Sequence, residues 1–304
     1  MIQLPTISML LLLAGSVGKG EPQTQESFQI SVNVNLVMLN ATVRDRSGIS
    51  VADLRQQDFE IHEDGVKQTI RLFKQEDTPV TVGLVVDHSG SMRHKLASVV
   101  AAARSFVQSS NPEDQMFVVN FNEMASLGLP QSMRLTNRVD DLTSAIANSP
   151  TEGMTALYDA VLLARNHLQD ANRSKKVLIV ISDGSDNASK HKLAEVVKMA
   201  QESTILVYAI GIFGEDDPDR NPDVLRRLTG ITGGEAYFPK HLDEVVATCE
   251  RIAHDIRSQY TIGYISTNLA QNAAYRTIRV TAKSPPNRKL TVRTRAGYIA
   301  GGAK

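Results

Sequence analysis

The chain has 304 residues, 42% of them hydrophobic, so it can bury one large core or two modest ones. Acidic and basic side chains balance at 33 each, which excludes a global attraction to nucleic acid or to anionic membranes. Aromatic residues make up only 5% and basic residues are scattered, so no stacking surface for single-stranded nucleic acid is visible. We therefore expect a globular protein of one or two domains that recognises any charged partner locally.

Residues 1–20 are typical of a secretory signal peptide. An apolar run from about residue 7 to residue 17 is followed by small residues and is too short to cross a bilayer comfortably. No Lys or Arg precedes the run, so an uncleaved N-terminal anchor is the alternative. Ser16 stands where a lipoprotein signal would need a cysteine, so we expect no lipidation. Residues 21–27 are the expected linker, and the mature protein is expected to be secreted, periplasmic or on the cell surface, without a membrane span.

Residues 28–78 alternate apolar and polar side chains, which is typical of half-buried β-strands, and Asp64-Gly65 indicates a hairpin. Strand patterns return in residues 258–300, in SQYTIGYIST, AYRTIRVTAK and RKLTVRTRAGYIA. Each segment is too short to cover its own strands with a second layer. We predict that the two segments form one small β-sandwich, and two independent β appendages are the alternative.

Residues 79–257 alternate apolar strands with amphipathic helices. The expected strands are 80–86, 115–121, 176–182, 204–210 and, more weakly, 235–238. The expected helices are 94–109, 137–148, 156–169, 190–203, 222–229 and 242–257. This alternation predicts right-handed crossovers and a doubly wound, mostly parallel sheet with helices on both faces. The predicted architecture is an α/β domain inserted between two β segments. Within its last helix, Cys249, the only cysteine of the chain, is interpreted as a small buried apolar residue, and a reactive thiol is the alternative.

Oxygen-bearing side chains follow the ends of two predicted strands. Asp87, Ser89 and Ser91 come at the end of VGLVVDHSGSM, and Asp183 ends the strand in VLIVISDGSDN. Thr155 begins a helix after the glycine-containing turn of TEGMTALYDA. Ligands of open α/β sheets bind outside the carboxyl ends of the strands, so the five side chains converge if the two strands are neighbours. Two carboxylates and three hydroxyls form a hard-oxygen set, which suits Mg²⁺, Mn²⁺ or Ca²⁺ and is poor for zinc or copper.

These segments resemble the von Willebrand factor A domain. DHSGS at 87–91 matches its D-x-S-x-S signature, and GMTALYDA and SDG match its second and third motif segments in the right order, so that the resemblance covers roughly residues 80–257. Together with LRQQDFEIHEDGVKQTI before and YTIGY after, the chain further resembles a von Willebrand factor A-related family of secreted acidobacterial proteins.

The resemblance implies a metal-ion-dependent adhesion site. On that pattern Ser89, Ser91 and Thr155 bind the ion directly, whereas Asp87 and Asp183 bind it directly or through water. A carboxylate of a partner protein then fills a vacant position on the metal. The resemblance also implies that the last helix, 242–257, can move when the metal coordination changes.

Several of these residues could also have roles apart from metal binding. Asp87 could cap the helix that begins near His94, and the serines could hydrogen-bond loop amides. His88 adjoins Ser89 as a hydrolase would require, but the G-x-S-x-G pattern is absent. Asp186 could pair with Asp183, although we interpret it as a solvated turn residue. The acidic segment 214–223 could bind calcium, but a solvated loop leading into a helix at residue 222 fits it better.

The sequence therefore predicts an exported, non-enzymatic binding or adhesion module that uses Mg²⁺, Mn²⁺ or Ca²⁺ to capture an acidic residue of a protein or extracellular polymer. A structural scaffold with a loop-stabilising metal is the alternative. A metal-dependent hydrolase with His88 as its base is a third hypothesis. No G-x-G-x-x-G or P-loop pattern occurs, so no nucleotide site is expected.

Overall fold

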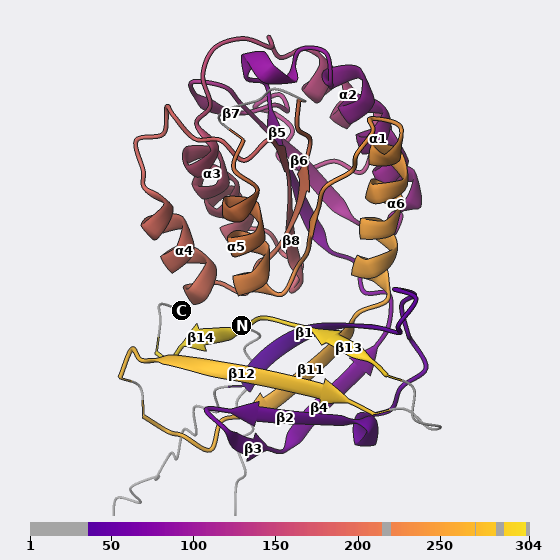
Figure 1. The fold of residues 1–304 in the computed structure, drawn as a ribbon, viewed down its shortest axis with the longest axis vertical. Coiled ribbons are helices and arrows are strands. Elements are labelled where there is room, and N and C mark those ends of the chain that lie inside the picture. Colours follow the sequence, from indigo (N-terminus) through magenta and orange to yellow (C-terminus); the bar gives the residue numbers. More distant parts are fainter. Residues whose placement is uncertain (1–35, 215–219, 271, 284–288, 302–304) are drawn as a thin grey trace, which may run out of the picture.

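The computed structural model describes residues 36–214, 220–270, 272–283 and 289–301, and it stacks an α/β unit on a β-sandwich (Figure 1). The predicted signal peptide and linker lie outside these residues, as does the start of the β module at residues 28–35. Residues 215–219 of the acidic segment also lie outside them. In the part of the chain that is described, no helix has the length and apolar character needed to cross a bilayer.

The α/β unit is built on a six-stranded sheet with the order β10-β9-β8-β5-β6-β7. Its strands are β5 (Thr81–Asp87), β6 (Gln115–Phe121), β7 (Ala125–Leu127), β8 (Lys176–Ser182), β9 (Leu206–Gly211) and β10 (Ala236–Tyr237). Neighbouring strands are parallel except β7, which runs antiparallel to β6 at one edge. Every residue of β5 is buried, because a parallel sheet covered on both faces has no solvated side.

Helices cover both faces of this sheet. They are α1 (Leu96–Ser109), α2 (Val139–Ala147), α3 (Leu157–Gln169), α4 (Leu193–Glu202), α5 (Pro222–Thr232) and α6 (Glu244–Arg257). Figure 1 shows α1, α2 and α6 on one face and α3, α4 and α5 on the other. Their apolar stripes join the strands in one core that includes Phe106, Leu157 and Cys249. The predicted doubly wound α/β fold is confirmed.

The flanking segments form two antiparallel four-stranded sheets, with the orders β13-β1-β11-β4 and β14-β12-β2-β3. From the N-terminal side come β1 (Leu36–Arg44), β2 (Phe59–Glu63), β3 (Val66–Gln68) and β4 (Ile70–Gln75). From the C-terminal side come β11 (Tyr260–Ile265), β12 (Tyr275–Ala282), β13 (Thr291–Arg293) and β14 (Gly297–Ile299). Each sheet therefore contains strands from both sides of the α/β unit.

The two sheets share one hydrophobic core. Leu39 and Ile61 pack in it with Ile262 and Val280, although the whole α/β unit lies between the two pairs in the chain. The rings of Phe59 and Tyr260 lie 5.0 Å apart between their centroids. The sequence prediction that the two β segments pack together is confirmed, because neither segment could cover its apolar face alone.

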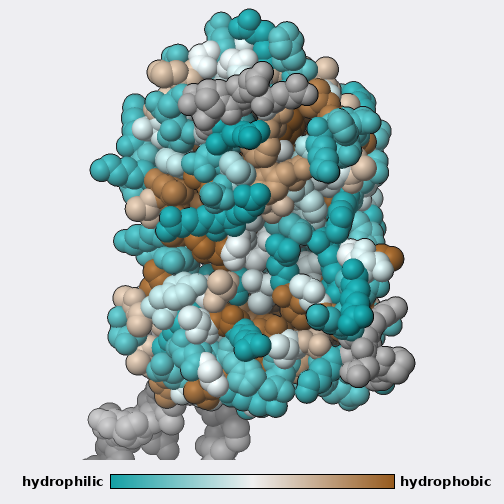
Figure 2. Space-filling model, viewed as in Figure 1, coloured by the Kyte–Doolittle hydropathy of each residue, from teal (hydrophilic) through white to brown (hydrophobic). Residues whose placement is uncertain are grey.

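Most apolar side chains lie inside two separate cores. One core fills the α/β unit and the other fills the sandwich. On the face shown in Figure 2, hydrophilic residues cover most of both units, and hydrophobic residues appear in small patches among them. This distribution is the usual one for a folded protein whose surface is in contact with water.

A cluster of charged side chains joins the sandwich to the α/β unit. Arg44 of β1 pairs with Glu235 at 2.5 Å and also with Asp255 in the last turn of α6, and Arg293 pairs with Glu235 at 3.0 Å. The hydroxyl of Tyr237 lies within hydrogen-bond distance of both carboxylates, and burial raises the pKa of this tyrosine well above its ordinary value. We call these five residues the junction cluster. They fix the sandwich against α6 and the edge of the central sheet.

Candidate metal site

The candidate site lies where the order of the central sheet reverses. β6 lies on one side of β5, whereas β8 and β9 lie on the other, which makes the carboxyl ends of β5 and β8 the expected place for a ligand. β5 and β8 pair in parallel from Thr81–Lys176 to Val86–Ile181. Asp87 ends β5 and Asp183 directly follows β8, so the two strands that carry the carboxylates are neighbours, as convergence of the five side chains requires.

Hydroxyl and carboxylate oxygens meet at this point. The Oγ atoms of Ser89 and Ser91 lie 3.1 Å apart, and Ser91 Oγ donates to Asp183 Oδ2 at 2.7 Å. Ser185 connects Thr155 to Asp183. Its Oγ donates to Thr155 Oγ1 at 3.3 Å, and its N–H donates to Asp183 Oδ1 at 3.0 Å. The structure thus joins Ser89, Ser91, Asp183 and Thr155 in one hydrogen-bonded set.

Asp87 lies beneath this set and is completely buried. Its Oδ1 accepts from the N–H of Ser89 at 2.8 Å, and its Oδ2 accepts from Ser182 Oγ at 2.6 Å. Burial raises the pKa of Asp87 to about 6, against the opposing effect of these hydrogen bonds. No side chain caps the start of α1, so the alternative helix-capping role of Asp87 is wrong.

Two glycines hold the loops around the site. Gly184 has a φ of +81°, and a Cβ there would lie 2.3 Å from the carbonyl oxygen of Asn221, whose N–H in turn donates to the carbonyl of Asp183. Gly153 has a φ of +78°, and its carbonyl accepts from the N–H of Gly90 at 3.1 Å. The first contact ties the loop after β8 to the start of α5, and the second ties the loop after β5 to the loop before α3.

Some residues of the site could not be assigned from the sequence. Asp186 is not the solvated turn residue that we predicted, because its Oδ2 accepts from the N–H of Tyr158 at 2.9 Å and from Ser189 Oγ at 2.5 Å, at the start of α3. Ser182 and Ser185, which bind Asp87 and Thr155, were missed. The only signal was the density of hydroxyl and carboxylate residues in SDGSDN.

The imidazole of His88 forms its hydrogen bond with Asn120 and not with the hydroxyls of the neighbouring serines. Its Nε2 lies 3.1 Å from Asn120 Oδ1, and the Asn120 amide donates to the carbonyl of Ala145 in α2. Burial lowers the pKa of His88, which favours the neutral imidazole. Within the described residues no hydrogen bond joins His88 to Ser89 or Ser91, and its imidazole is instead linked through Asn120 of β6 to α2.

The donor set fits a hard divalent cation. Asp87 and Asp183 are 0% and 1% exposed, and neither forms a salt bridge with a basic side chain of the described residues. A buried carboxylate without a countercharge is costly, and a cation at this position would supply one. In the part of the chain that the structure describes, no group of three or more His, Cys, Asp or Glu could hold a metal. The candidate site does not form such a group, because three of its five ligands are hydroxyls.

Comparison with known proteins agrees with this fold. The family model described as von Willebrand factor type A domain matches residues 81–251. A von Willebrand factor type A structure from Catenulispora acidiphila is similar, with 14% identity and a TM-score of 0.53, covering 88% of this chain and 75% of the other.

Two further solved structures match a smaller share of this chain. The von Willebrand factor domain of the type V pili tip protein Mfa5 from Porphyromonas gingivalis has 12% identity and a TM-score of 0.47, covering 59% of this chain and 95% of the other. Proximal thread matrix protein 1 from the mussel byssus, with a zinc-occupied MIDAS motif, has 18% identity and a TM-score of 0.49, covering 62% and 48%. The family model matches more than half of the residues of the present chain, which therefore belongs to the von Willebrand factor type A domain family.

Proposed function

We propose that the protein binds a divalent cation through Asp87, Ser89, Ser91, Thr155 and Asp183, and that it uses this cation to capture a carboxylate of a partner protein or an extracellular polymer. The observation that carries the proposal is the pair of buried carboxylates at the ends of adjacent strands, which hydroxyls surround and no basic side chain of the described residues neutralises. Mg²⁺, Mn²⁺ and Ca²⁺ all accept such oxygen ligands.

The balance of ligands favours capture of an acidic group. Three of the five ligands are neutral hydroxyls, so a bound divalent ion keeps more of its positive charge than it would among carboxylates alone. Ser91 is exposed, which supports an ion at the protein surface and within reach of a partner. A carboxylate of the partner is the charged oxygen ligand that such an ion would take up.

The remaining parts of the proposal rest on the sequence and on His88. The signal-peptide pattern of residues 1–20 supports export to the periplasm, the medium or the cell surface, in line with the resemblance to secreted acidobacterial proteins. The engagement of the His88 imidazole with Asn120, away from the serines, supports a binding function without catalysis.

Calorimetric titration of the purified protein with Mg²⁺, Mn²⁺ and Ca²⁺ tests the metal site. We expect saturable binding that Asp87→Ala abolishes. Glu152→Gln is the matched control, since it removes an exposed carboxylate from the same loop as Thr155 and should leave binding intact. The metal assignment fails if the native protein and Asp87→Ala take up these ions equally, or if neither binds them.

Binding to immobilised poly-L-glutamate, with and without EDTA, tests the capture of carboxylates. We expect retention that needs the metal and disappears in Asp87→Ala. Metal binding without metal-dependent retention would reject the capture mechanism and favour a scaffold in which the ion only stabilises the loops. Such a scaffold would show a metal-dependent rise in Tm and no competition between carboxylates and the ion's vacant position.

A further inference from the structure

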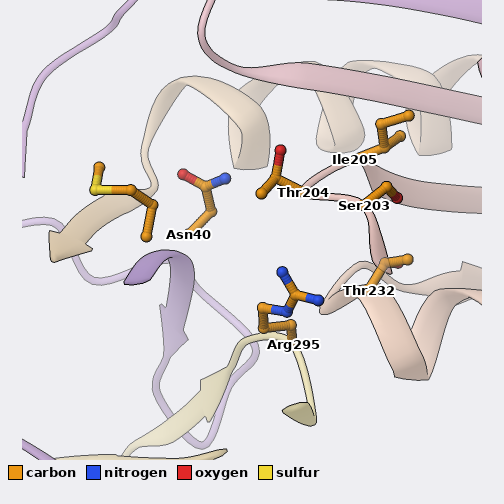
Figure 3. A pocket seen from close by; sticks show the side chains of 7 residues that line it. Asn40, Ser203, Thr204, Ile205, Thr232 and Arg295 are labelled. Atoms are coloured by element: carbon orange, nitrogen blue, oxygen red, sulfur yellow. The ribbon is translucent and has the colours of Figure 1, made fainter. Parts of the chain in front are cut away.

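A small polar cavity lies at the junction of the two units, at the amino end of the central sheet and therefore opposite the metal site. Its lining includes Asn40 of β1, Ser203 and Thr204 before β9, Thr232 at the end of α5, and Arg295 (Figure 3). The centre of a water-sized sphere can occupy about 10 Å³ of it. Because this volume counts positions of the sphere's centre, the cavity has room for one small occupant, a water molecule or a monatomic ion, and too little for phosphate or sulfate.

Arg295 is a buried cation without a carboxylate partner in the described residues. Only 9% of it is exposed, and it forms no salt bridge there. Its Nε donates to the carbonyl of Gly297 at 2.8 Å and its Nη2 to the carbonyl of Gln201 at 2.9 Å, and among the residues that the structure describes no hydrogen bond uses Nη1. By contrast, the buried Arg276 pairs with Glu63 at 3.1 Å. Backbone carbonyls solvate Arg295 but leave its charge without a counterion.

Hydrogen-bond donors converge on the cavity. Figure 3 shows the guanidinium of Arg295 pointing into the space between Asn40, Thr204 and Thr232. The amide of Asn40 borders the same space, and its side chain forms no hydrogen bond with the described residues. A cation and an amide that face a partly open cavity without an acidic acceptor make a site for an anion. The same positive charge disfavours a metal ion.

We propose that this cavity binds a halide-sized monovalent anion, chloride in particular, between Arg295 and Asn40. The anion is the countercharge that Arg295 lacks, and it accepts hydrogen bonds from the free guanidinium N–H groups and the amide. Ser203 and Thr204 belong to the α/β unit, whereas Asn40 and Arg295 belong to the sandwich segments, so the bound anion stabilises the junction between them. The proposal does not depend on the metal site.

Thermal unfolding in sodium chloride, sodium bromide and sodium gluconate at equal ionic strength, with EDTA present, tests the site. We expect chloride and bromide to raise the Tm saturably by a few degrees relative to gluconate, which is too large for the cavity. Arg295→Met and Asn40→Ala should remove this increment. Arg293→Met is the control, because that arginine lies two residues away and pairs with Glu235, so its loss should lower the Tm but keep the halide increment.

Crystals grown in bromide give a second readout, an anomalous peak beside Arg295 that Asn40→Ala weakens. Equal Tm values in the three salts would overturn the proposal, as would a halide increment that survives in both cavity variants or a bromide crystal without a peak in the cavity. If Arg295→Met does not fold, Asn40→Ala carries the comparison, since the Asn40 side chain makes no hydrogen bond with the described residues that the fold would lose.

Discussion

Ser91 Oγ donates a hydrogen bond of 2.7 Å to Asp183 Oδ2, although 92 residues separate the two in the chain. The contact exists because β5 and β8 are neighbours in the sheet, so that the loops after both strands open at the same edge. A hydroxyl that binds a carboxylate in this way is already close to where a shared cation would contact both. The arrangement makes Ser91 the most direct probe of the candidate site.

Replacing Ser91 by Ala should weaken metal binding without unfolding the protein. The residue is exposed, so we expect the free energy of unfolding to change by less than about 1 kcal/mol. Loss of a ligand should lower the affinity for Mg²⁺ at least about tenfold, as measured by calorimetry. Ser91→Thr keeps the hydroxyl and should retain most of the affinity; unchanged affinity in Ser91→Ala would remove this residue from the ligand set.

The stability of the metal-free protein should depend on the protonation of Asp87. Burial raises its pKa from the ordinary 3.8 to about 6, so the folded state favours the protonated carboxyl. The resulting stabilisation is complete below about pH 4 and is lost as the pH rises through about 6, a difference of about 3 kcal/mol. Urea unfolding in EDTA across this range should show the loss, and Asp87→Asn should lack this component of the pH dependence.

The proton and the metal should compete for Asp87. Because the raised pKa keeps the carboxyl protonated below about pH 6, Mg²⁺ affinity should fall steadily as the pH drops through this value. Calorimetry at several pH values in buffers of different ionisation enthalpy would also detect the released proton. An affinity that stays constant between about pH 5 and pH 7 would contradict direct or water-mediated involvement of this carboxylate.

Gly184→Ala should be far more harmful than Gly65→Ala. Both glycines have a φ of +81°, but a Cβ at Gly184 would lie 2.3 Å from the carbonyl oxygen of Asn221, whereas a Cβ at Gly65 meets nothing within 4 Å. We expect Gly65→Ala to cost about 1 to 2 kcal/mol of stability from its backbone conformation alone. Gly184→Ala should cost more and also weaken metal binding, because the loop that carries Asp183 must move. Equal costs in urea unfolding would show that the Asn221 contact is easily relieved.

The junction cluster should respond differently to single and double substitution. Arg44→Met leaves the side chain of Asp255, only 2% exposed, without its cation, and should cost about 3 to 5 kcal/mol in urea unfolding. Adding Asp255→Asn removes the uncompensated charge and should recover part of this loss. If the double variant is less stable than the sum of the two single variants predicts, the pair is not coupled as its contact implies.

Cys249 should be inert in the native protein. It is 2% exposed, and burial raises the pKa of its thiol to about 12, so little thiolate forms at neutral pH. Modification by Ellman's reagent should be slow in buffer and become rapid in urea. Fast modification without denaturant would show that α6 opens from the sheet.

The strands of the α/β unit could be predicted from the sequence, because burial on both faces of the sheet leaves unbroken apolar runs. The sequence predicted 115–121 and 176–182 with the bounds that the structure has for β6 and β8. β7 was missed because its three residues are too few to show a period. The strand expected at 204–210 was placed two residues too early at its start. β9 begins at Leu206, and Thr204 borders the junction cavity instead.

The sequence motif and the expected sheet topology predicted the proposed ligands of the candidate site, but not the contacts that surround them. Four of the five proposed ligands could be named because they lie at or just after strand ends, and Thr155 because it begins a helix after a glycine-containing turn; hydrogen bonds connect these segments in the structure. The roles of Ser182 and Asp186 depend on which loops contact each other, and so does the partner of His88. No spacing in the sequence encodes these contacts between segments.

The pairing of β4 with β11 has a consequence for the architecture as a whole. Gln75 and Tyr260 face each other in that ladder, so the α/β unit departs from one strand and returns to its immediate neighbour. Its two ends are therefore about 5 Å apart at the sandwich, the distance that a tight hairpin turn would otherwise close. The α/β unit is thus an insertion between two adjacent antiparallel strands, in the place where a hairpin would have its turn. A force applied to the sandwich therefore reaches both ends of the α/β unit at two adjacent strands, beside the junction cluster that also joins the two units.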